Sequence, residues 1–181
     1  MSNDISYRIL NINDWQEYKQ AYLEWSRDNP TVLATRYEDV LLRPDLHWQE
    51  MLCNPKLTIW GCFMADKLAA IASITYLNWS ARYPESTISQ LPASVQCERY
   101  YLSSVYNRPE YRGNGLMLDF VQHILVHHNK QKNLALIVAI NNLRAIKLYQ
   151  KLGFEIVETL PARIMGDNLP YPEYLMELIL N

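Results

Sequence analysis

The residues best suited to chemistry form a short glycine turn, Tyr-Arg-Gly-Asn-Gly, at positions 111–115. An extended, aromatic-rich run at 99–106 precedes it, and an apolar run with helical periodicity at 116–128 follows it. This pattern predicts a strand, a tight turn and a helix. Gly113 and Gly115 let the backbone bend and leave its N–H groups uncovered by side chains. Because such N–H groups at a helix N-terminus favour negative charge, the turn predicts a phosphate or pyrophosphate site.

Two other kinds of site are disfavoured by the same stretch. No Gly-Lys-Ser/Thr follows the glycines and no Gly-x-Gly-x-x-Gly is present, which argues against a kinase-like or dinucleotide site. Asp119, His123 and His127 recur at four-residue steps in the following helix. Three residues in a row along one helix converge poorly on one ion, and no cysteine lies near them. We therefore expect no metal site.

Composition narrows the class of protein and its partners. The 181 residues predict a single domain, and 49% hydrophobic with 20% charged residues is typical of soluble globular proteins. A net charge of -2 and a pI near 6.1 argue against a nucleic-acid partner. No apolar run approaches a membrane span and no secretory signal is visible, so no membrane partner is expected. Cys53, Cys62 and Cys97 form neither a disulfide framework nor a zinc spacing, which favours a reducing, cytoplasmic location.

Hydrophobic periodicity and turn residues predict the elements that must position the glycine turn. In the first half we expect strands at 6–12, 57–64 and 68–77, and helices at 15–27 (capped by Asp14), 37–42 and 45–53. Residues 79–97, with two prolines, read as a long loop. In the second half we expect strands at 98–106, 134–140, 154–158 and 174–180, helices at 116–129 and 142–152, and a Pro/Gly-bearing excursion at 161–172. This order predicts an α/β protein with a mixed sheet and helices on both faces.

The glycine turn and a second motif resemble one known family. The turn is similar to the acetyl-CoA pyrophosphate loop of the GCN5-related N-acetyltransferases (GNAT), Gln/Arg-x-x-Gly-x-Gly/Ala. Arg112 and Gly115 match it, whereas Met117 departs from the small residue at its end. Residues 142–154 resemble the family's Asn-x-x-Ala-x-x-x-Tyr-x-x-x-Gly-Phe motif, and all five fixed positions match: Asn142, Ala145, Tyr149, Gly153 and Phe154. One predicted helix and one strand separate the two motifs, as in that family.

The resemblance implies a fold and a cosubstrate site. The fold would be a single mostly antiparallel sheet of six to seven strands, with a central parallel strand pair and helices on both faces. Acetyl-CoA would be the acyl donor, with no metal. The strand at 105–107 would splay from its parallel neighbour at 134–140, so that the N–H of Val105 or Asn107 polarises the acetyl carbonyl. The implied acetyl-CoA-binding residues are Val105, Tyr106, Asn107, Arg112, Gly113, Asn114, Gly115, Leu116, Met117, Asn142 and Tyr149.

The resemblance also implies an activity, direct acetyl transfer to a primary amine through a tetrahedral intermediate. Tyr149 matches a tyrosine that lies near the CoA sulfur and acts as general acid. Glu98 is the best-placed carboxylate for the general base, with Tyr101, Ser103 or a water chain as alternatives. The acceptor would be a small-molecule or peptide amine, bordered by residues such as Trp25, Tyr37 and Trp79. A homodimer is a further expectation, and a non-catalytic acyl-CoA-binding or regulatory module is the alternative function.

Overall fold

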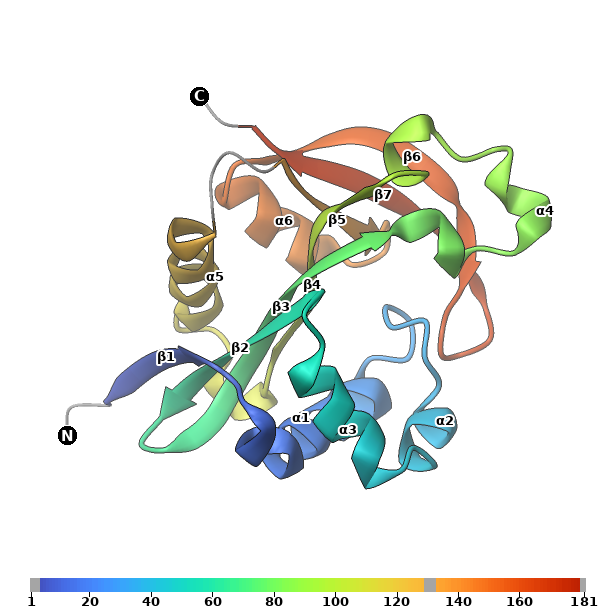
Figure 1. Ribbon diagram of the computed structural model, residues 1–181. Coiled ribbons are helices and arrows are strands. Elements are labelled where there is room, and N and C mark those ends of the chain that lie inside the picture. The colour runs from blue at the N-terminus through green and yellow to red at the C-terminus, as the bar shows by residue number, and fades with distance from the viewer. Residues whose placement is uncertain (1–3, 129–132, 180–181) are drawn as a thin grey trace.

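The computed structural model describes residues 4–128 and 133–179, and its seven strands form one sheet (Figure 1). The spatial order is β1-β2-β3-β4-β5-β7-β6. Neighbouring strands are antiparallel except β4 and β5, which are parallel. The strands are β1 Ile5–Ile9, β2 Leu57–Met64, β3 Lys67–Asn78, β4 Glu98–Asn107, β5 Leu134–Ala139, β6 Phe154–Ile164 and β7 Pro170–Leu178. The expected fold, a mostly antiparallel sheet with a central parallel pair, is confirmed.

Helices cover both faces of the sheet, as the element order predicts. The α-helices are α1 Trp15–Asp28, α2 Tyr37–Leu41, α3 Asp45–Cys53, α4 Glu85–Ile88, α5 Leu116–His127 and α6 Leu143–Lys151. The 3-10 turns are η1 Ile12–Asp14, η2 Trp79–Arg82, η3 Ala93–Val95 and η4 Pro109–Tyr111. Helices α5 and α6 pack on one face, where their apolar residues join one core cluster with the central strands. Helices α1 and α3 pack on the other face against β2 and β3.

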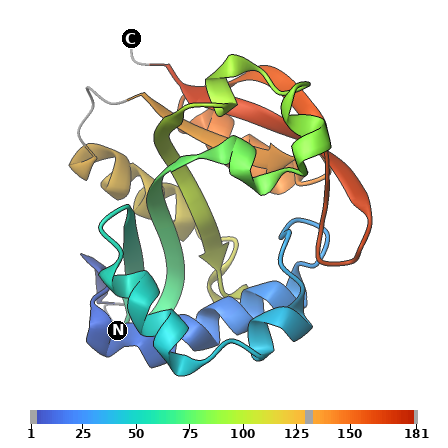
Figure 2. The same ribbon diagram turned by 45° about the vertical axis from the view of Figure 1, so that its right-hand side comes forward.

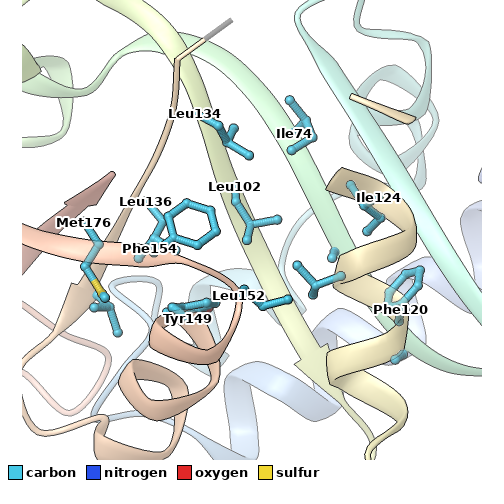
Figure 3. Packing of buried hydrophobic residues seen from close by; sticks show 14 of the residues in the cluster. Ile74, Leu102, Phe120, Ile124, Leu134, Leu136, Tyr149, Leu152, Phe154 and Met176 are labelled. Carbon is cyan, nitrogen blue, oxygen red and sulfur yellow. The ribbon is translucent and has the colours of Figure 1, made fainter. Parts of the chain in front are cut away.

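The core under α5 and α6 fixes the second motif in place (Figure 3). Phe120 and Ile124 of α5 are fully buried, and Leu102 of β4 and Leu136 of β5 meet them from the sheet. Tyr149 of α6 belongs to the same cluster. Fully burying an apolar side chain of this size contributes roughly 1.5–3 kcal/mol. The helix carrying Tyr149 is therefore held to the sheet by packing.

The segment expected to be a plain loop at 79–97 has structure of its own, which corrects that prediction. It contains η2, α4 and η3, and it packs over β4, β5 and β7 through a third core cluster that includes Trp79, Val95 and Leu175. The Asn78 side chain accepts a hydrogen bond from the Ser80 N–H at 3.0 Å, which starts the first turn. Figure 2 shows this segment and the α1–α3 group at opposite ends of the central strands.

The last hairpin also differs from the sequence expectation. Strand β6 continues to Ile164 and β7 already begins at Pro170, so most of the expected excursion at 161–172 is strand. Pro161 is accommodated because β6 is an edge strand and its register with β7 shifts between Leu160 and Arg163. The expected ends of the helix at 129 and of the last strand at 180 lie outside the described residues.

The start of α1 is a further correction. Asp14 makes no side-chain cap to α1; instead Asn11 caps the preceding turn η1, and the Asp14 carboxylate accepts the Asn11 N–H at 2.7 Å. Arg8 donates two hydrogen bonds to the same carboxylate, at 2.7 and 2.8 Å. These bonds hold the pKa of Asp14 below its usual value. Asp14 therefore ties β1 to the entry of α1.

Candidate active site

The glycine turn between β4 and α5 is an open cradle of backbone N–H groups. Gly113 and Gly115 have φ angles of +89° and +85°, a conformation that favours glycine. A Cβ added at either position would meet nothing within 4 Å. The Leu116 N–H is bonded to the Asn114 side chain at 3.1 Å, whereas the N–H groups of residues 113–115 have no acceptor within the described chain. The turn thus offers unpaired donors at the N-terminus of α5.

Side-chain hydrogen bonds hold this turn against the end of β4. Arg112 donates through Nε to the Asn107 carbonyl at 2.9 Å, and Asn107 donates through Nδ2 to the Tyr111 carbonyl at 3.1 Å. Arg108 donates to Glu24 of α1 at 2.7 Å and to the Leu68 carbonyl at 2.7 Å. The cradle is therefore anchored to both β3 and α1.

Strands β4 and β5 separate just before the turn. Their ladder contains only two pairs, Tyr100↔Leu134 and Tyr101↔Ala135, although β4 runs on to Asn107. Ser104 has a φ of +52°, and the register between β3 and β4 shifts opposite it. An irregular residue of this kind in an antiparallel pair is a β-bulge, which bends the strand and re-aims its neighbours.

A backbone N–H group of β4 points into the gap between the two strands. The Arg108 N–H bonds to Ala69 of β3 at 3.0 Å. Because successive N–H groups of a regular strand alternate in direction, that of Asn107 faces away from β3, toward the gap, whereas Val105 lies in the irregular stretch and lines the cavity. The Asn107 carbonyl, which meets Arg112 on that side, agrees with this direction. Both residues thus remain candidates for holding a carbonyl oxygen.

A single cavity of about 650 Å³ brings the two motifs together. It is lined by all eleven residues that the resemblance assigns to acetyl-CoA: Val105, Tyr106, Asn107, Arg112, Gly113, Asn114, Gly115, Leu116, Met117, Asn142 and Tyr149. Among these, Tyr106 is buried and its ring stacks on Trp25 of α1, with centroids 6.1 Å apart. Met117, which departs from the small residue of the motif, lines the cavity with the glycines.

Glu98 does not join these residues. It lies at the other end of β4, exposed, and forms an ion pair with Lys56 at 2.7 Å. Six residues of extended chain separate it from Ser104, about 20 Å of strand. It is not among the residues lining the cavity. The carboxylate singled out from the sequence is therefore remote from Tyr149 and the glycine cradle.

Tyr149 of α6 lines the cavity and also belongs to the core cluster under α5 and α6. Only 8% of the residue is exposed, and its ring meets Phe154 edge-on with centroids 6.1 Å apart. Burial raises the pKa of its hydroxyl well above the ordinary tyrosine value. The phenol is therefore a proton donor throughout the neutral pH range. Asn142 caps the same helix, since its Oδ1 accepts the Ala145 N–H at 3.2 Å.

Three cations on α6 were not singled out from the sequence. Arg144, Lys147 and Lys151 line the cavity, and none of them has a carboxylate partner within the described residues. Their three- and four-residue spacing places them on one face of the helix, which was the signal available in the sequence. Together they give that wall a positive charge suited to phosphate groups.

The rest of the cavity, here named the acceptor end, is lined by Tyr22, Trp25, Trp79, Arg82, Arg163 and Glu173. Glu173 is 1% exposed, accepts hydrogen bonds from Arg163 at 2.7 and 3.1 Å, and accepts the Tyr83 hydroxyl at 2.8 Å. Trp25 and Trp79 were expected at this border, whereas Tyr37 does not line the cavity. Arg82 and Arg163 were not singled out from the sequence because they come from segments that read as a loop and an excursion.

A pair of hydroxyl groups also lines the cavity. Ser103 and Thr75, on neighbouring strands, have hydroxyl oxygens 2.8 Å apart, and Ser73 extends the chain at 2.9 Å from Ser103. Tyr101, the other expected alternative, is fully buried and does not line the cavity. Burial raises its pKa to about 12. Ser103 is thus the one alternative base side chain that the cavity exposes.

Within residues 4–128 and 133–179, no group of three or more His, Cys, Asp or Glu side chains could hold a metal ion. None of the helices in these ranges is both long and apolar enough to cross a membrane.

Comparison with protein-family models decides the family. The model of the acetyltransferase (GNAT) family matches residues 12–154. The chain belongs to this family. The matched range contains both motifs, the splayed strands and most of the cavity wall, so the resemblance read from 112–117 and 142–154 is confirmed. A search of curated proteins found no match.

Solved structures of GNAT acetyltransferases share the fold across nearly the whole chain. Salmonella typhimurium yncA, a putative acetyltransferase solved with acetyl-CoA, is 17% identical, with a TM-score of 0.71 over 98% of this chain and 95% of that one. Arabidopsis thaliana NAA60 with acetyl-CoA is 16% identical, with a TM-score of 0.68 over 96% and 97%. A Salmonella typhimurium enzyme that modifies the N-terminal serine of ribosomal protein L7/L12 is 10% identical, with a TM-score of 0.70 over 100% and 97%.

Proposed function

We propose that this protein is an N-acetyltransferase that moves the acetyl group of acetyl-CoA to a primary amine. Membership of the acetyltransferase family supports acyl transfer in general. The observation that carries the finer proposal is one cavity lined by the open glycine cradle, the donors of the β4–β5 gap and Tyr149. A phosphate site, a carbonyl site and an acid in one cavity are the parts that acetyl transfer from CoA requires.

The proposed acetyl-CoA site uses the cradle first. The N–H groups of residues 113–115 would hold the pyrophosphate, helped by the N-terminus of α5. Arg144, Lys147 and Lys151 would face the phosphate groups with charges that no carboxylate within residues 4–128 and 133–179 pairs with. Asn142, whose Oδ1 caps α6, keeps its Nδ2 for the pantetheine arm.

The proposed reaction is direct attack of the amine on the thioester. The N–H groups of Val105 and Asn107 are the donors offered to the acetyl oxygen, and they would strengthen as the tetrahedral intermediate gains charge. Tyr149 would donate its proton to the departing sulfur. Its raised pKa keeps it protonated at neutral pH, and a hydrogen-bonded phenol stabilises the developing thiolate before transfer is complete.

The amine must be neutral when it attacks. Among the residues that the structure describes, Glu173 is the one carboxylate that lines the cavity, and it is already paired with Arg163. We propose that water held by the Ser103–Thr75 hydroxyl pair takes the proton, in place of Glu98. The net positive charge of the cavity assists, because a nearby cation disfavours an ammonium group and lowers its pKa.

A thiol-release assay with acetyl-CoA and a panel of primary amines, including peptide N-termini, tests the proposal. We expect CoA formation that depends on the amine and a fall in kcat of about 100-fold or more in Tyr149→Phe. Calorimetry with CoA serves as the control, because the phenylalanine ring preserves the packing and should leave CoA affinity within a few-fold. CoA binding without turnover of any amine would instead identify the non-catalytic acyl-CoA-binding module.

A further inference from the structure

Among the charged groups that the structure describes at the acceptor end, one arginine has no carboxylate partner. Arg163 is paired with the buried Glu173 at 2.7 Å, and Tyr83 donates a further hydrogen bond to the same carboxylate. Arg82, at the end of η2, lines the same wall. Within the described residues it forms no ion pair and no hydrogen bond to a carboxylate. The acceptor end therefore carries a net charge of one positive unit.

Aromatic contacts hold the Arg82 guanidinium at this wall. Its central carbon lies 4.9 Å from the centroid of the Trp79 ring, which is buried, and the Arg163 guanidinium lies 5.6 Å from the same ring. A cation over the face of a tryptophan is attracted by the ring electrons. Arg82 itself keeps part of its surface open to solvent. It is thus oriented by the protein and still reachable by a ligand.

The electrostatic surroundings of Arg82 also favour an anion. Desolvation and the neighbouring Arg163 lower the pKa of its guanidinium, and these effects outweigh the smaller opposing influences of Tyr22 and Glu173, so its charge is not fully compensated. An arginine ionises so far above neutral pH that it stays charged nevertheless. A planar guanidinium presents paired N–H donors that match the two oxygens of a carboxylate.

We propose that the acceptor is a small amine that carries a carboxylate, and that Arg82 binds this carboxylate and sets the enzyme's specificity. The inference rests on the proposed acetyltransferase function, and it names the class of acceptor. Binding the carboxylate would orient the amine relative to the acetyl group. It would also offset the repulsion between the positive cavity and an ammonium group, which a simple amine or polyamine would meet without compensation.

A hydrogen-bonded bridge supports the wall of the cavity at 32–35 from behind, and we expect a small acceptor beside this wall. The loop between α1 and α2, which lines the cavity at 32–35, is joined to the turn between β6 and β7. Gly166 donates its N–H to Leu33 at 2.8 Å and Asp167 donates to Pro30 at 3.2 Å. Both ribbon views show this loop beside that hairpin (Figures 1 and 2). A free amino acid or dipeptide is such a small acceptor.

Matched acceptors test the proposal through kcat/KM. Leucine is compared with leucinamide, and glycyl-leucine with its amide, so that the carboxylate is removed with little change of shape. We expect wild type to prefer at least one carboxylate over its amide by tenfold or more. The α-amine of each amide loses its proton at a lower pH than the α-amine of the corresponding acid. This difference favours turnover of the amides and therefore opposes the expected preference. Arg82→Gln should abolish the preference by lowering kcat/KM for the acids at least tenfold more than for the amides, and Arg82→Lys should restore part of it.

The matched control is Arg36→Gln, which removes the same charge from an exposed arginine outside the cavity. It should leave the preference unchanged. Equal turnover of acids and amides by wild type, or equal losses for both in Arg82→Gln, would overturn the assignment of Arg82.

A second readout separates this inference from the proposed function. If no amine is acetylated, the acetyltransferase proposal fails, and calorimetry then tests Arg82 alone. N-acetyl-leucine and its amide are titrated into the CoA-loaded protein. Tighter binding of the acid, lost in Arg82→Gln, supports a carboxylate site; binding of neither, or of both equally, rejects it.

Discussion

At the scale of single residues, Gly113 and Gly153 allow the backbone strain of a substitution to be distinguished from its effect on ligand binding. Gly113, Gly115 and Gly153 all have φ angles between +85° and +90°. A side chain at such a φ costs roughly 1–2 kcal/mol. Gly113 faces open space, whereas Gly153 ends α6 and would place a Cβ 3.6 Å from Leu178. Alanine at either site should therefore strain the backbone, but only at Gly113 should it also occupy the open space of the cradle.

We predict that Gly113→Ala and Gly153→Ala each lower the free energy of unfolding by roughly 1–2 kcal/mol, because both force alanine into the left-handed region. Only Gly113→Ala should weaken CoA binding, by about tenfold or more, since its methyl group occupies the cradle. Urea unfolding and calorimetry with CoA measure the two effects. Equal CoA affinity in both variants would show that the pyrophosphate lies elsewhere.

At the scale of elements, the buried Glu173–Arg163 pair joins β7 to β6 and, through Tyr83, to the segment at 79–95. We predict that Arg163→Gln lowers the free energy of unfolding by roughly 3–5 kcal/mol, because it strands a carboxylate that is 1% exposed. The double variant Arg163→Met with Glu173→Met should recover most of this loss, since no buried charge remains. Thermal unfolding of the three proteins is the measurement, and a single variant as stable as wild type would refute the prediction.

The bridge between the α1–α2 loop and the β6–β7 turn depends on Gly166. A Cβ there would lie 3.1–3.2 Å from the backbone carbonyl oxygens of Leu33, Thr35 and Pro30. We predict that Gly166→Ala pushes the loop away and speeds amide hydrogen exchange at 30–36 and 165–169, with a loss of about 1 kcal/mol of stability. Exchange within α5 serves as the internal control. Unchanged exchange in both segments would contradict a bridge of this kind.

A helix or strand could be predicted from the sequence where nearby residues define it, and not where distant residues stabilise it. Strand β2 and helix α3 were predicted with their observed bounds, because apolar periodicity and flanking prolines define them. The segment at 79–95 and the length of β6 were not, because their stability comes from long-range partners. Trp79 packs on Tyr101, and Pro161 is tolerated only at an irregular sheet edge.

The site divides in the same way. The residues that the family resemblance assigns to acetyl-CoA come from short contiguous stretches, 105–107, 112–117 and the motif at 142–154, so local patterns suffice to name them, and their role stays a prediction. The acceptor end is built by Tyr22, Arg82 and Glu173, which come from α1, η2 and β7 and meet only through the topology of the sheet. Glu98, whose role as base stays a prediction, lies near a motif in sequence but about six strand residues from Ser104, and it does not line the cavity.

At the scale of the whole molecule, histidines on opposite faces of the sheet couple stability to pH. Burial lowers the pKa of His47 on α3, aided by Arg43. Burial also lowers the pKa of His123 on α5, aided by His127, whose ring centroid lies 4.1 Å away. For each group the folded pKa lies below the unfolded value of about 6.5. The unfolded chain therefore binds more protons between the two values, so stability is complete above pH 6.5 and falls as pH drops toward the folded values.

We predict a lower free energy of urea unfolding at pH 5.5 than at pH 7.5, with both faces contributing. His47→Gln combined with His123→Gln should flatten this dependence, because glutamine keeps a polar side chain without a charge to acquire. Asp14 does not contribute to the difference between pH 5.5 and 7.5. Because its pKa is lowered in the folded protein, its stabilising effect is lost only at more acidic pH, as the pH falls below the usual carboxylate range. A double variant as sensitive as wild type between pH 5.5 and 7.5 would place the dependence on other groups.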